Sequence, residues 1–391
     1  MSLGIVYFIL AILVIIMIHE AGHFIAAKRL GFKATKFFLG FGPTLFSFHK
    51  GETEYGIKAL PLGGFVKIVG MNPYEEVAAE DEHRSYPNKP KWQRAIVILG
   101  GPVTHWILAF VVLTATMMTI GLPTSDASNE VAEISTEIEG TRTPAAAAGL
   151  REGDVIVGIG TLKTDSWNEI RSYIREHRDE RASFVVERDG KRVTLDVTLG
   201  RAIVAPSGEV LDLAPPGGEL RSAKAGEEVV GFFGVQPEPK YDTLSLPSAV
   251  SQSGTEIWRI TTGSVAQLGS VFTPIFDGTL LDAIRGEGER PQGVGLVGAS
   301  RIAGETVEAG RFLQFIDLMI VLTIFLGIMN LLPLPPLDGG HLAIIGYEAI
   351  TNKRVDIRKI IPVAAAVISF FLILFVAFLY LDIVDPIRLP L

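Results

Sequence analysis

The chain has 391 residues, of which 48% are hydrophobic, and its mean hydropathy of +0.36 is too high for an ordinary soluble enzyme. Its formal net charge of −8 gives no support for a nucleic-acid partner. The chain contains no cysteine, which excludes disulfides, thiolate catalysis and cysteine metal ligands.

The apolar residues are concentrated in four stretches without charge. Three of them reach the ~20 residues that a helix needs to cross a bilayer, and the first does so if it continues through His19 to Ala27. A signal peptide is the alternative for the first stretch, but it lacks a basic start and a small-residue cleavage site. We therefore predict a polytopic α-helical membrane protein with transmembrane helices within residues 1–30, 94–122, 312–340 and 360–382.

The first helix contains the stretch "IIMIHEAGHFIAA" at residues 15–27. Its His19, Glu20 and His23 form an H-E-x-x-H motif, in which two histidines four residues apart share one helix face. Both imidazoles can then bind one Zn²⁺ ion, with Glu20 as general base. Ionisable groups inside a membrane helix are costly, which favours this interpretation over a chance match.

Residues 31–93 are predicted to form a re-entrant loop and a β-hairpin on the cytoplasmic side. The stretch "FLGFGPTLFSF" (38–48) is apolar but interrupted by Gly and Pro, which favours a loop that dips into the membrane. Residues 54–70 combine strand-forming residues with a Pro-Leu-Gly-Gly turn, which favours a β-hairpin or a small sheet. The segments 28–94 and 353–359 are rich in Lys and Arg, which places both on the cytoplasmic side and both chain termini outside.

The segment after the second helix has the character of an extracytoplasmic soluble domain. Residues 126–239, with "AGLREGDVI" at 148–156 and a helical stretch near 166–176, resemble a PDZ domain of the α/β class. Residues 201–230 are expected to be an inserted loop, and residues 240–311 a connector along the outer membrane face. The groove of such a domain binds peptides by strand addition.

The third helix ends in "GIMNLLPLPPLDGGH" (327–341), and a cytoplasmic loop is expected at 341–359. Its prolines interrupt the helix where a cavity must form, so Asn330 and Asp338 are candidate site residues. Asp338 is our predicted third metal ligand, with His341 as its rival, because both follow the break at the depth of the first motif. The remaining loop histidines, His49, His83 and His177, are expected at the surface.

Together these motifs resemble the bacterial site-2 proteases, intramembrane zinc metalloproteases that cleave anti-sigma factors. The marks are "HEAGH", "GFG" at 40–42, "PLGGFVKI" at 61–68, "GGP" at 100–102 and "NLLPLPPLDGG" at 330–340. The resemblance implies that His19, His23 and Asp338 bind zinc, Glu20 activates water, and Asn330 hydrogen-bonds the substrate carbonyl or the oxyanion. It also implies that residues 54–70 supply a strand edge to an unwound substrate helix. The residues predicted for this edge are Gly64, Phe65, Val66, Lys67 and Ile68. One departure is His105 at the position of a family asparagine, which we interpret as a hydrogen-bonding substitute rather than an accessory ligand.

The expected function is hydrolysis of peptide bonds within the transmembrane segments of single-pass proteins, either anti-sigma factors or remnant signal peptides, in regulated intramembrane proteolysis. The expected location is the bacterial plasma membrane, with the lipid bilayer and the single-pass substrate as partners. One alternative is a membrane-anchored metalloprotease that acts on soluble or misfolded membrane proteins. Another is a metal-binding transporter or receptor, which the absence of internal repeats and the presence of Glu20 disfavour.

Overall fold

The computed structural model describes residues 3–72, 74–138, 141–206, 210–214, 216–288, 290–291 and 294–386. The chain divides into two compact units. The helical unit consists of residues 1–115 and 246–391. Residues 116–245 form the second unit, called the outer unit after the location predicted for it from the sequence.

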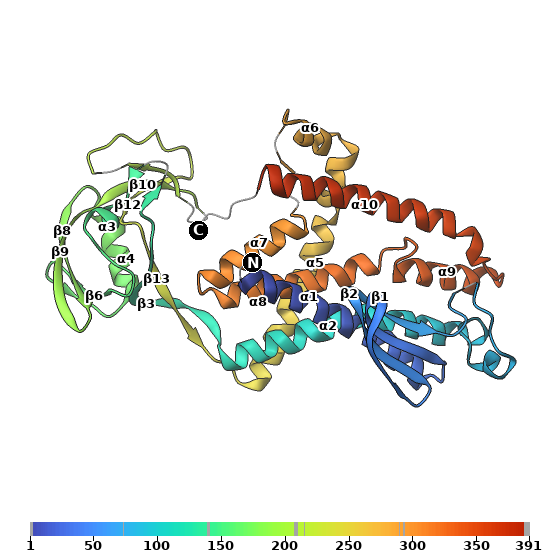
Figure 1. Ribbon diagram of the computed structural model, residues 1–391. Coiled ribbons are helices and arrows are strands. Elements are labelled where there is room, and N and C mark those ends of the chain that lie inside the picture. Colours follow the sequence, from blue (N-terminus) through green and yellow to red (C-terminus); the bar gives the residue numbers. More distant parts are fainter. Residues whose placement is uncertain are drawn as a thin grey trace. The chain divides into compact units, whose positions relative to one another are not determined.

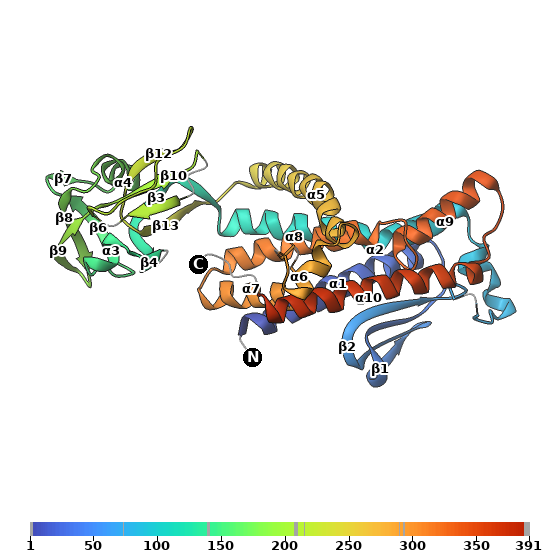
Figure 2. The same cartoon turned by 90° about the horizontal axis from the view of Figure 1, so that it is seen from above.

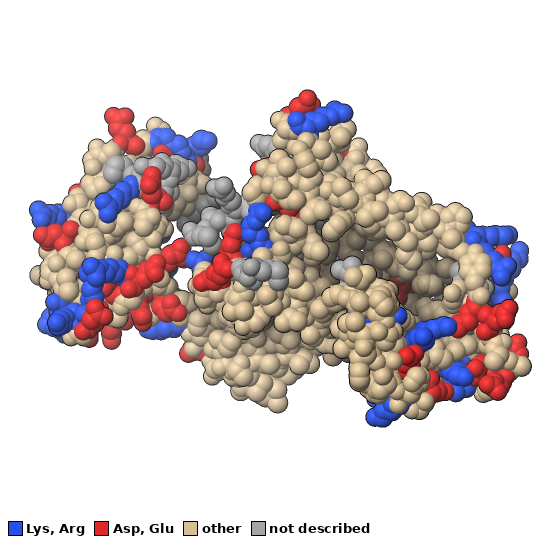
Figure 3. Space-filling view, in the orientation of Figure 1, with Lys and Arg blue, Asp and Glu red and all other residues tan. Residues whose placement is uncertain are grey.

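Four helices of the described chain are long and apolar enough to cross a membrane, which confirms the number expected from hydropathy. Figure 1 shows that they run in alternating directions, and the face of the helical unit in Figure 3 carries few charges between its two ends. They are α1 (Leu3–Arg29), α2 (Lys91–Thr119), α8 (Phe312–Asn330) and α10 (Ile361–Val384).

The segment between α1 and α2 differs from what the sequence predicted, because most of it forms strands. Residues 38–48, predicted as a re-entrant loop, belong to the long strand β1 (Ala34–Lys50), which pairs with β2 (Thr53–Ile68). Gly40 and Gly42, both with φ of +85°, bend the strand without ending it. Short 3₁₀ helices η1 (Ala79–Arg84) and η2 (Tyr86–Asn88) then lead to α2.

Because β1 and β2 both bend, they form more than a simple hairpin. Residues 36–39 pair with residues 54–57 and also with residues 64–67, so they must lie between them. Of the two alternatives predicted for residues 54–70, a β-hairpin or a small sheet, the hairpin is wrong, since its two arms flank β1 instead of each other, whereas a small sheet is present. Residues 64–68, here called the edge segment, have no second partner among the described strands. The sheet packs beside α1 (Figure 1, Figure 2).

The region predicted to be a connector, residues 240–311, mixes helical patterns with Gly and Ser in its sequence, and it forms three helices that belong to the helical unit. Trp106 Nε1 of α2 donates a 3.0 Å hydrogen bond to Thr261, and Thr114 donates one to Ser253. The helices are α5 (Leu246–Phe276), α6 (Thr279–Arg285) and α7 (Leu296–Glu308). Their many Gly, Ser and Thr residues weaken the hydropathy signal, but small residues are suited to close helix packing.

The third span is shorter than predicted, because α8 ends at Asn330 and a non-helical turn follows. The chain then re-enters a helix, α9 (Asp338–Thr351), where the sequence predicted a cytoplasmic loop. Gly339 and Gly340 allow this turn, since a Cβ on Gly339 would lie 2.2 Å from the carbonyl oxygens of Leu331 and Leu332.

The outer unit is an α/β module with a main core and a smaller apolar cluster around Ala202, Val204 and Val230. Its six-stranded sheet has the order β13-β3-β6-β8-β9, with β7 paired to β6, and the apolar face of α4 (Trp167–Glu176) contributes Trp167, Ile170 and Ile174 to the core. The other strands of this sheet are β3 (Leu122–Ile134), β6 (Val155–Ile159), β7 (Leu162–Lys163), β8 (Arg181–Arg188), β9 (Lys191–Thr198) and β13 (Val235–Asp242). The short elements are β4 (Glu137–Ile138), β5 (Thr141–Arg142) and α3 (Pro144–Ala147).

The prediction of an inserted loop at residues 201–230 is mostly wrong. This region contains a three-stranded sheet of β11 (Val210–Ala214), β10 (Gly200–Val204) and β12 (Glu228–Phe232). The described Gly and Pro residues of the region lie between the strands, so composition averaged over 30 residues hid three strands of five residues each.

Candidate metal centre

The two histidines of the H-E-x-x-H motif lie one helical turn apart near the end of α1. The Nε2 atoms of His19 and His23 approach to 3.1 Å, and both side chains are largely buried. Helical periodicity alone produces this pairing, because residues i and i+4 lie on one face.

Asp338, the first residue of α9, completes the cluster. Its Oδ2 atom lies 3.3 Å from Nε2 of His19 and 3.4 Å from Nε2 of His23. This oxygen is buried and has no hydrogen-bond partner among the described residues. Among these residues, the three side chains are the one group whose geometry could hold a metal ion.

The spacing of these atoms fits zinc. Tetrahedral zinc with bonds of about 2.0–2.1 Å keeps its ligand atoms about 3.3 Å apart, which matches the three separations of 3.1, 3.3 and 3.4 Å. Two imidazoles and one carboxylate are also a donor set typical of catalytic zinc, which leaves a fourth position open.

The other ring nitrogen of each histidine has a partner that fixes its tautomer. His23 Nδ1 donates a 2.8 Å hydrogen bond to the carbonyl oxygen of Val97, which leaves its Nε2 free to bind metal. With Nε2 of His19 also free, its Nδ1 donates to Nε2 of His105 at 3.0 Å, and His105 Nδ1 donates to Thr323 at 3.0 Å. These contacts support the interpretation of His105 as a hydrogen-bonding substitute.

Three glycines let α2 approach the motif, and sequence reasoning did not assign them this role. A Cβ on Gly22 would lie 2.1 Å from the carbonyl oxygen of Gly100, and one on Gly101 would lie 2.2 Å from His23 Nε2 and 2.8 Å from His19 Cε1. The backbones of α1 and α2 therefore touch directly. The available signal was a small residue within the motif of one apolar helix and a Gly-Gly pair in the next.

The metal cluster opens into a cavity of about 280 Å³. Glu20 and Asn330 both line it, as the sequence predicted, and so do Val66 and Ile68 of the edge segment and His341. A backbone hydrogen bond from Val66 reaches the Glu20 carboxyl. One cavity is thus lined by the metal cluster, a general-base candidate in Glu20, the amide of Asn330 and the edge segment.

Comparison with known proteins identifies the kind of site this is. The model of peptidase family M50 matches residues 7–376 of the chain. The chain belongs to peptidase family M50. It is 35% identical to zinc metalloprotease Rip1 of Mycobacterium tuberculosis, over 99% of this chain and 98% of that protein. It is also 27% identical to zinc metalloprotease RasP of Shouchella clausii, over 90% of this chain and 92% of that protein. With its four apolar helices, this M50 peptidase is a membrane-integral zinc metalloprotease.

Of the five residues predicted to hold the substrate, only some lie at the cavity of the M50 peptidase. Within the edge segment, Gly64 lies close to Glu20, since a Cβ on it would be 3.2 Å from Glu20 Cγ. Phe65 stacks on Phe38 instead, and Lys67 forms a 2.8 Å ion pair with Glu75. The strand alternation thus directs only some of its side chains toward the cavity.

The remaining histidines lie outside the metal cluster. His341 is three residues beyond Asp338 and lines the cavity, but it is not part of the three-residue group. His49 and His83 are exposed, and His177 belongs to the outer unit, where its ring stacks on Tyr173.

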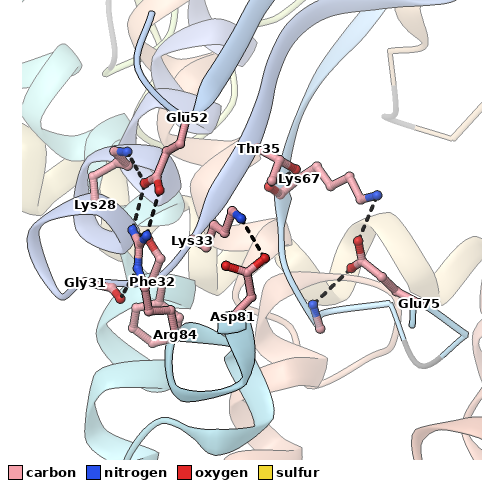
Figure 4. A network of polar contacts seen from close by, with 11 residues as sticks. Lys28, Gly31, Phe32, Lys33, Thr35, Glu52, Lys67, Glu75, Asp81 and Arg84 are labelled. Atoms are coloured by element: carbon pink, nitrogen blue, oxygen red, sulfur yellow. Dashed lines mark hydrogen bonds and ion pairs between the residues drawn. The ribbon is translucent and has the colours of Figure 1, made fainter. Parts of the chain in front are cut away.

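A network of ion pairs holds the sheet of the M50 peptidase to the end of α1 (Figure 4). Glu52, in the turn between β1 and β2, contacts Lys28 at 2.5 Å and two nitrogens of Arg84 at 2.7 Å. The hydrogen bonds from Arg84, supported by Lys28, lower the pKa of Glu52 to about 2. Lys33 forms a further pair with Asp81 at 2.6 Å. These contacts join α1, the strand turn and η1, and so help to position the edge segment beside Glu20.

Proposed function

We propose that this M50 peptidase hydrolyses peptide bonds within the transmembrane segments of single-pass membrane proteins. The observation that carries the proposal is the convergence of His19, His23 and Asp338, within 3.1–3.4 Å of one another, on a cavity that residues of the apolar helices α1, α2 and α8 help to line. A protease that acts on soluble chains has no need for a site built from membrane helices.

In the proposed mechanism His19, His23 and Asp338 hold zinc. The spacing of their Nε2 and Oδ2 atoms supports this role. When bound, zinc lowers the pKa of a water ligand to about 7 and polarises a carbonyl, which makes hydrolysis possible at neutral pH. Glu20 takes the proton from the attacking water and delivers it to the leaving amine. The Asn330 amide donates a hydrogen bond to the oxygen on which negative charge develops.

A second cavity supports a substrate that arrives through the membrane. It has a volume of about 620 Å³ and shares Asn330 and Leu337 with the catalytic cavity. Its walls are almost entirely apolar and come mainly from α8 and α10, with Phe325, Phe371 and Phe375 among the lining residues. A space of this composition suits an apolar helix rather than a polar peptide.

The edge segment supports the proposal that the substrate is held as a strand. A helix hides its peptide bonds, so cleavage requires local unwinding, and the exposed backbone groups then need new partners in a medium without water. The unpaired edge of residues 64–68 offers such partners next to Glu20. The ordered strand on its other side, residues 36–39, keeps this edge in place.

We further propose that the outer unit is a PDZ-like domain outside the bacterial plasma membrane, with both chain termini on the same side. The Lys and Arg residues of the segments that follow α1 and α9 support this orientation. A cavity of about 350 Å³ between α4 and residues 230–237 supports peptide binding. Arg171 and Arg175 lie at this cavity and could pair with the carboxylate of a cut substrate.

The test uses proteoliposomes that contain the full-length enzyme and a single-pass anti-sigma factor already trimmed on its outer side. The wild-type enzyme is expected to cut within the transmembrane segment, and Glu20→Gln is expected to lose at least ~10²-fold in rate while it keeps its zinc. Equal cleavage by both variants would refute the mechanism. Cleavage of soluble or misfolded proteins but not of the single-pass substrate would instead favour a membrane-anchored protease of general specificity.

A further inference from the structure

A third cavity of the helical unit lies away from the metal centre, where α2 begins and α9 ends. It has a volume of about 360 Å³. Its walls are residues 87–91, Arg94, Glu348 and residues 352–354, which are distant in sequence. In the proposed orientation this is the cytoplasmic edge of the membrane, where lipid headgroups lie.

The cavity has a surplus of positive charge. Five basic side chains line it, whereas Glu348 is its one acidic residue; the five are Lys89, Lys91, Arg94, Lys353 and Arg354. Both oxygens of Glu348 are already engaged, since Oε2 accepts from Arg94 at 2.5 Å and Oε1 accepts from the backbone N–H of Val355 at 3.2 Å. In the described part of the chain no carboxylate forms an ion pair with the other four basic residues.

Arg94 provides an independent indication of a ligand. It is only 9% exposed, and although its Nη2 pairs with Glu348, its buried Nε has no hydrogen-bond partner among the described residues. The guanidinium that lines the cavity is thus held at low exposure, where its charge is less screened by water and favours an anion nearby. In the first turn of α2, the N–H groups of Gln93 and Arg94 donate to the carbonyl oxygen of Pro90, which leaves those of Lys91 and Trp92 without a backbone acceptor in the described chain.

The lysines of the cavity are held by neutral acceptors and so keep their full charge for an anion. Lys91 Nζ donates to the carbonyl oxygen of Glu348 at 2.7 Å and to Asn352 at 3.1 Å, and Lys89 Nζ donates to the carbonyl oxygen of Leu30 at 3.2 Å. These contacts fix the two ammonium groups at the cavity, which lowers the entropy lost when an anion binds.

We propose that this cavity binds a phosphate group, either that of an anionic phospholipid or free phosphate. The occupant would join the start of α2 to the end of α9. Since α2 contains Gly101 and His105 and α9 begins at Asp338, phosphate binding would stabilise the relative position of two helices that build the metal centre. The site goes beyond the proposed proteolysis, because it neither contacts the substrate cavity nor takes part in hydrolysis.

The test compares the wild-type protein with the double variant Lys353→Gln/Arg354→Gln. Its matched control is Lys191→Gln/Arg192→Gln, which removes two adjacent exposed charges from the outer unit. Native mass spectrometry counts the phosphatidylglycerol or phosphatidylcholine retained by each delipidated protein, and thermal unfolding is followed with each lipid and with inorganic phosphate. Equal zinc content in all three proteins serves as the check on folding.

Phosphatidylglycerol is expected to bind and stabilise the wild type and the control alike. Each Lys or Arg beside an anionic lipid contributes about fivefold in affinity, so the double variant should bind ~30-fold more weakly. The same loss with inorganic phosphate alone would identify free phosphate as the occupant. If all three proteins retain phosphatidylglycerol and respond to phosphate equally, or if zwitterionic phosphatidylcholine binds as well as phosphatidylglycerol, the cavity does not select an anionic phosphate group and the proposal fails.

Discussion

At the scale of single residues, Gly101 places the strictest demand on the metal centre. A methyl group at this position would occupy the space of the two imidazoles, at 2.2 Å from His23 Nε2. We expect Gly101→Ala to displace the histidines and to lower the zinc content of the purified protein by about tenfold or more. Elemental analysis of the metal content measures this directly.

The control is a glycine in a helix with open space around it. A Cβ on Gly346 of α9 meets nothing within 4 Å. Gly346→Ala should therefore keep full zinc content and raise the free energy of unfolding by ~0.5–1 kcal/mol, because alanine favours a helix. Loss of zinc in both variants would mean that the helices respond to any added side chain, and that contact with the histidines is not the cause.

The choice between Asp338 and His341 as third ligand is a second question at this scale. Asp338 Oδ2 lies within 3.4 Å of both histidine nitrogens, whereas His341 only lines the cavity. We expect Asp338→Asn to lose most of its zinc and His341→Ala to keep it. Metal analysis of both folded variants decides the matter, and the reverse pattern would assign the ligand to His341.

At the scale of secondary-structure elements, the edge segment leads to a prediction about backbone hydrogen bonds. The N–H of Val66 reaches Glu20, and residues 64–68 have one unpaired edge. Val66→Pro removes this N–H, whereas Val66→Ala keeps it and only shortens the side chain. Cleavage should fall much further in the proline variant, with zinc content unchanged in both. Similar losses in both variants would indicate that Val66 acts by packing.

Another element-scale prediction concerns the C-terminal end of α10. Asp382 is completely buried and accepts hydrogen bonds from Arg290 at 2.6 Å and from the backbone N–H of Gly298 at 2.7 Å. Arg290→Met leaves a buried carboxylate without its cation, which should cost about 3–5 kcal/mol of the free energy of unfolding. Thermal unfolding in detergent measures the loss.

A surface ion pair gives the matched control. Arg181 and Asp196 lie on β8 and β9 of the outer unit, and the Arg181 side chain is 71% exposed, so Arg181→Met should cost less than about 1 kcal/mol. The double variant Arg290→Met/Asp382→Leu should recover most of the lost stability, since it removes both charges. Equal destabilisation by the two single variants would contradict a special role for the buried pair.

The elements also show which parts of the fold can be predicted from sequence. The apolar spans and the H-E-x-x-H spacing follow from local periodicity, so the four helices and the pairing of His19 with His23 were predictable. The double pairing of residues 36–39 was not, because it depends on partners as far as 31 residues away that no local pattern encodes. The role of Gly101 depends on the contact between two helices and was also beyond prediction.

At the scale of the whole molecule, the outer unit is joined to the helices by the paired strands β3 and β13. Ala127 pairs with Pro239, so residues 130–238 can be replaced by a short Gly-Ser linker between strands that already lie side by side. We expect this deletion to keep zinc and to relax discrimination against substrates with large outer domains. Cleavage assays with trimmed and untrimmed substrates measure the effect.

Two outcomes would contradict this role of the outer unit as a size filter. The first is unchanged discrimination between the trimmed and untrimmed substrates. The second is loss of all activity toward the trimmed substrate in a deletion variant that still binds zinc. That second result would favour a groove that grips the substrate terminus, and Arg171→Gln in the intact protein should then weaken binding of a peptide with a free carboxylate.

The five-residue length of the unpaired strand edge sets a limit on how a substrate must move. Five residues span ~7.5 Å in a helix but ~17 Å when extended along a strand. The bound segment of the substrate therefore becomes ~9 Å longer when it unwinds. To allow this, the chain on one side of the segment has to move into the bilayer by the same distance. A folded domain anchored at the membrane surface prevents such sliding. Trimming of the outer domain would thus release the tether that keeps the transmembrane segment from lengthening, whether or not any part of the protease measures the size of that domain.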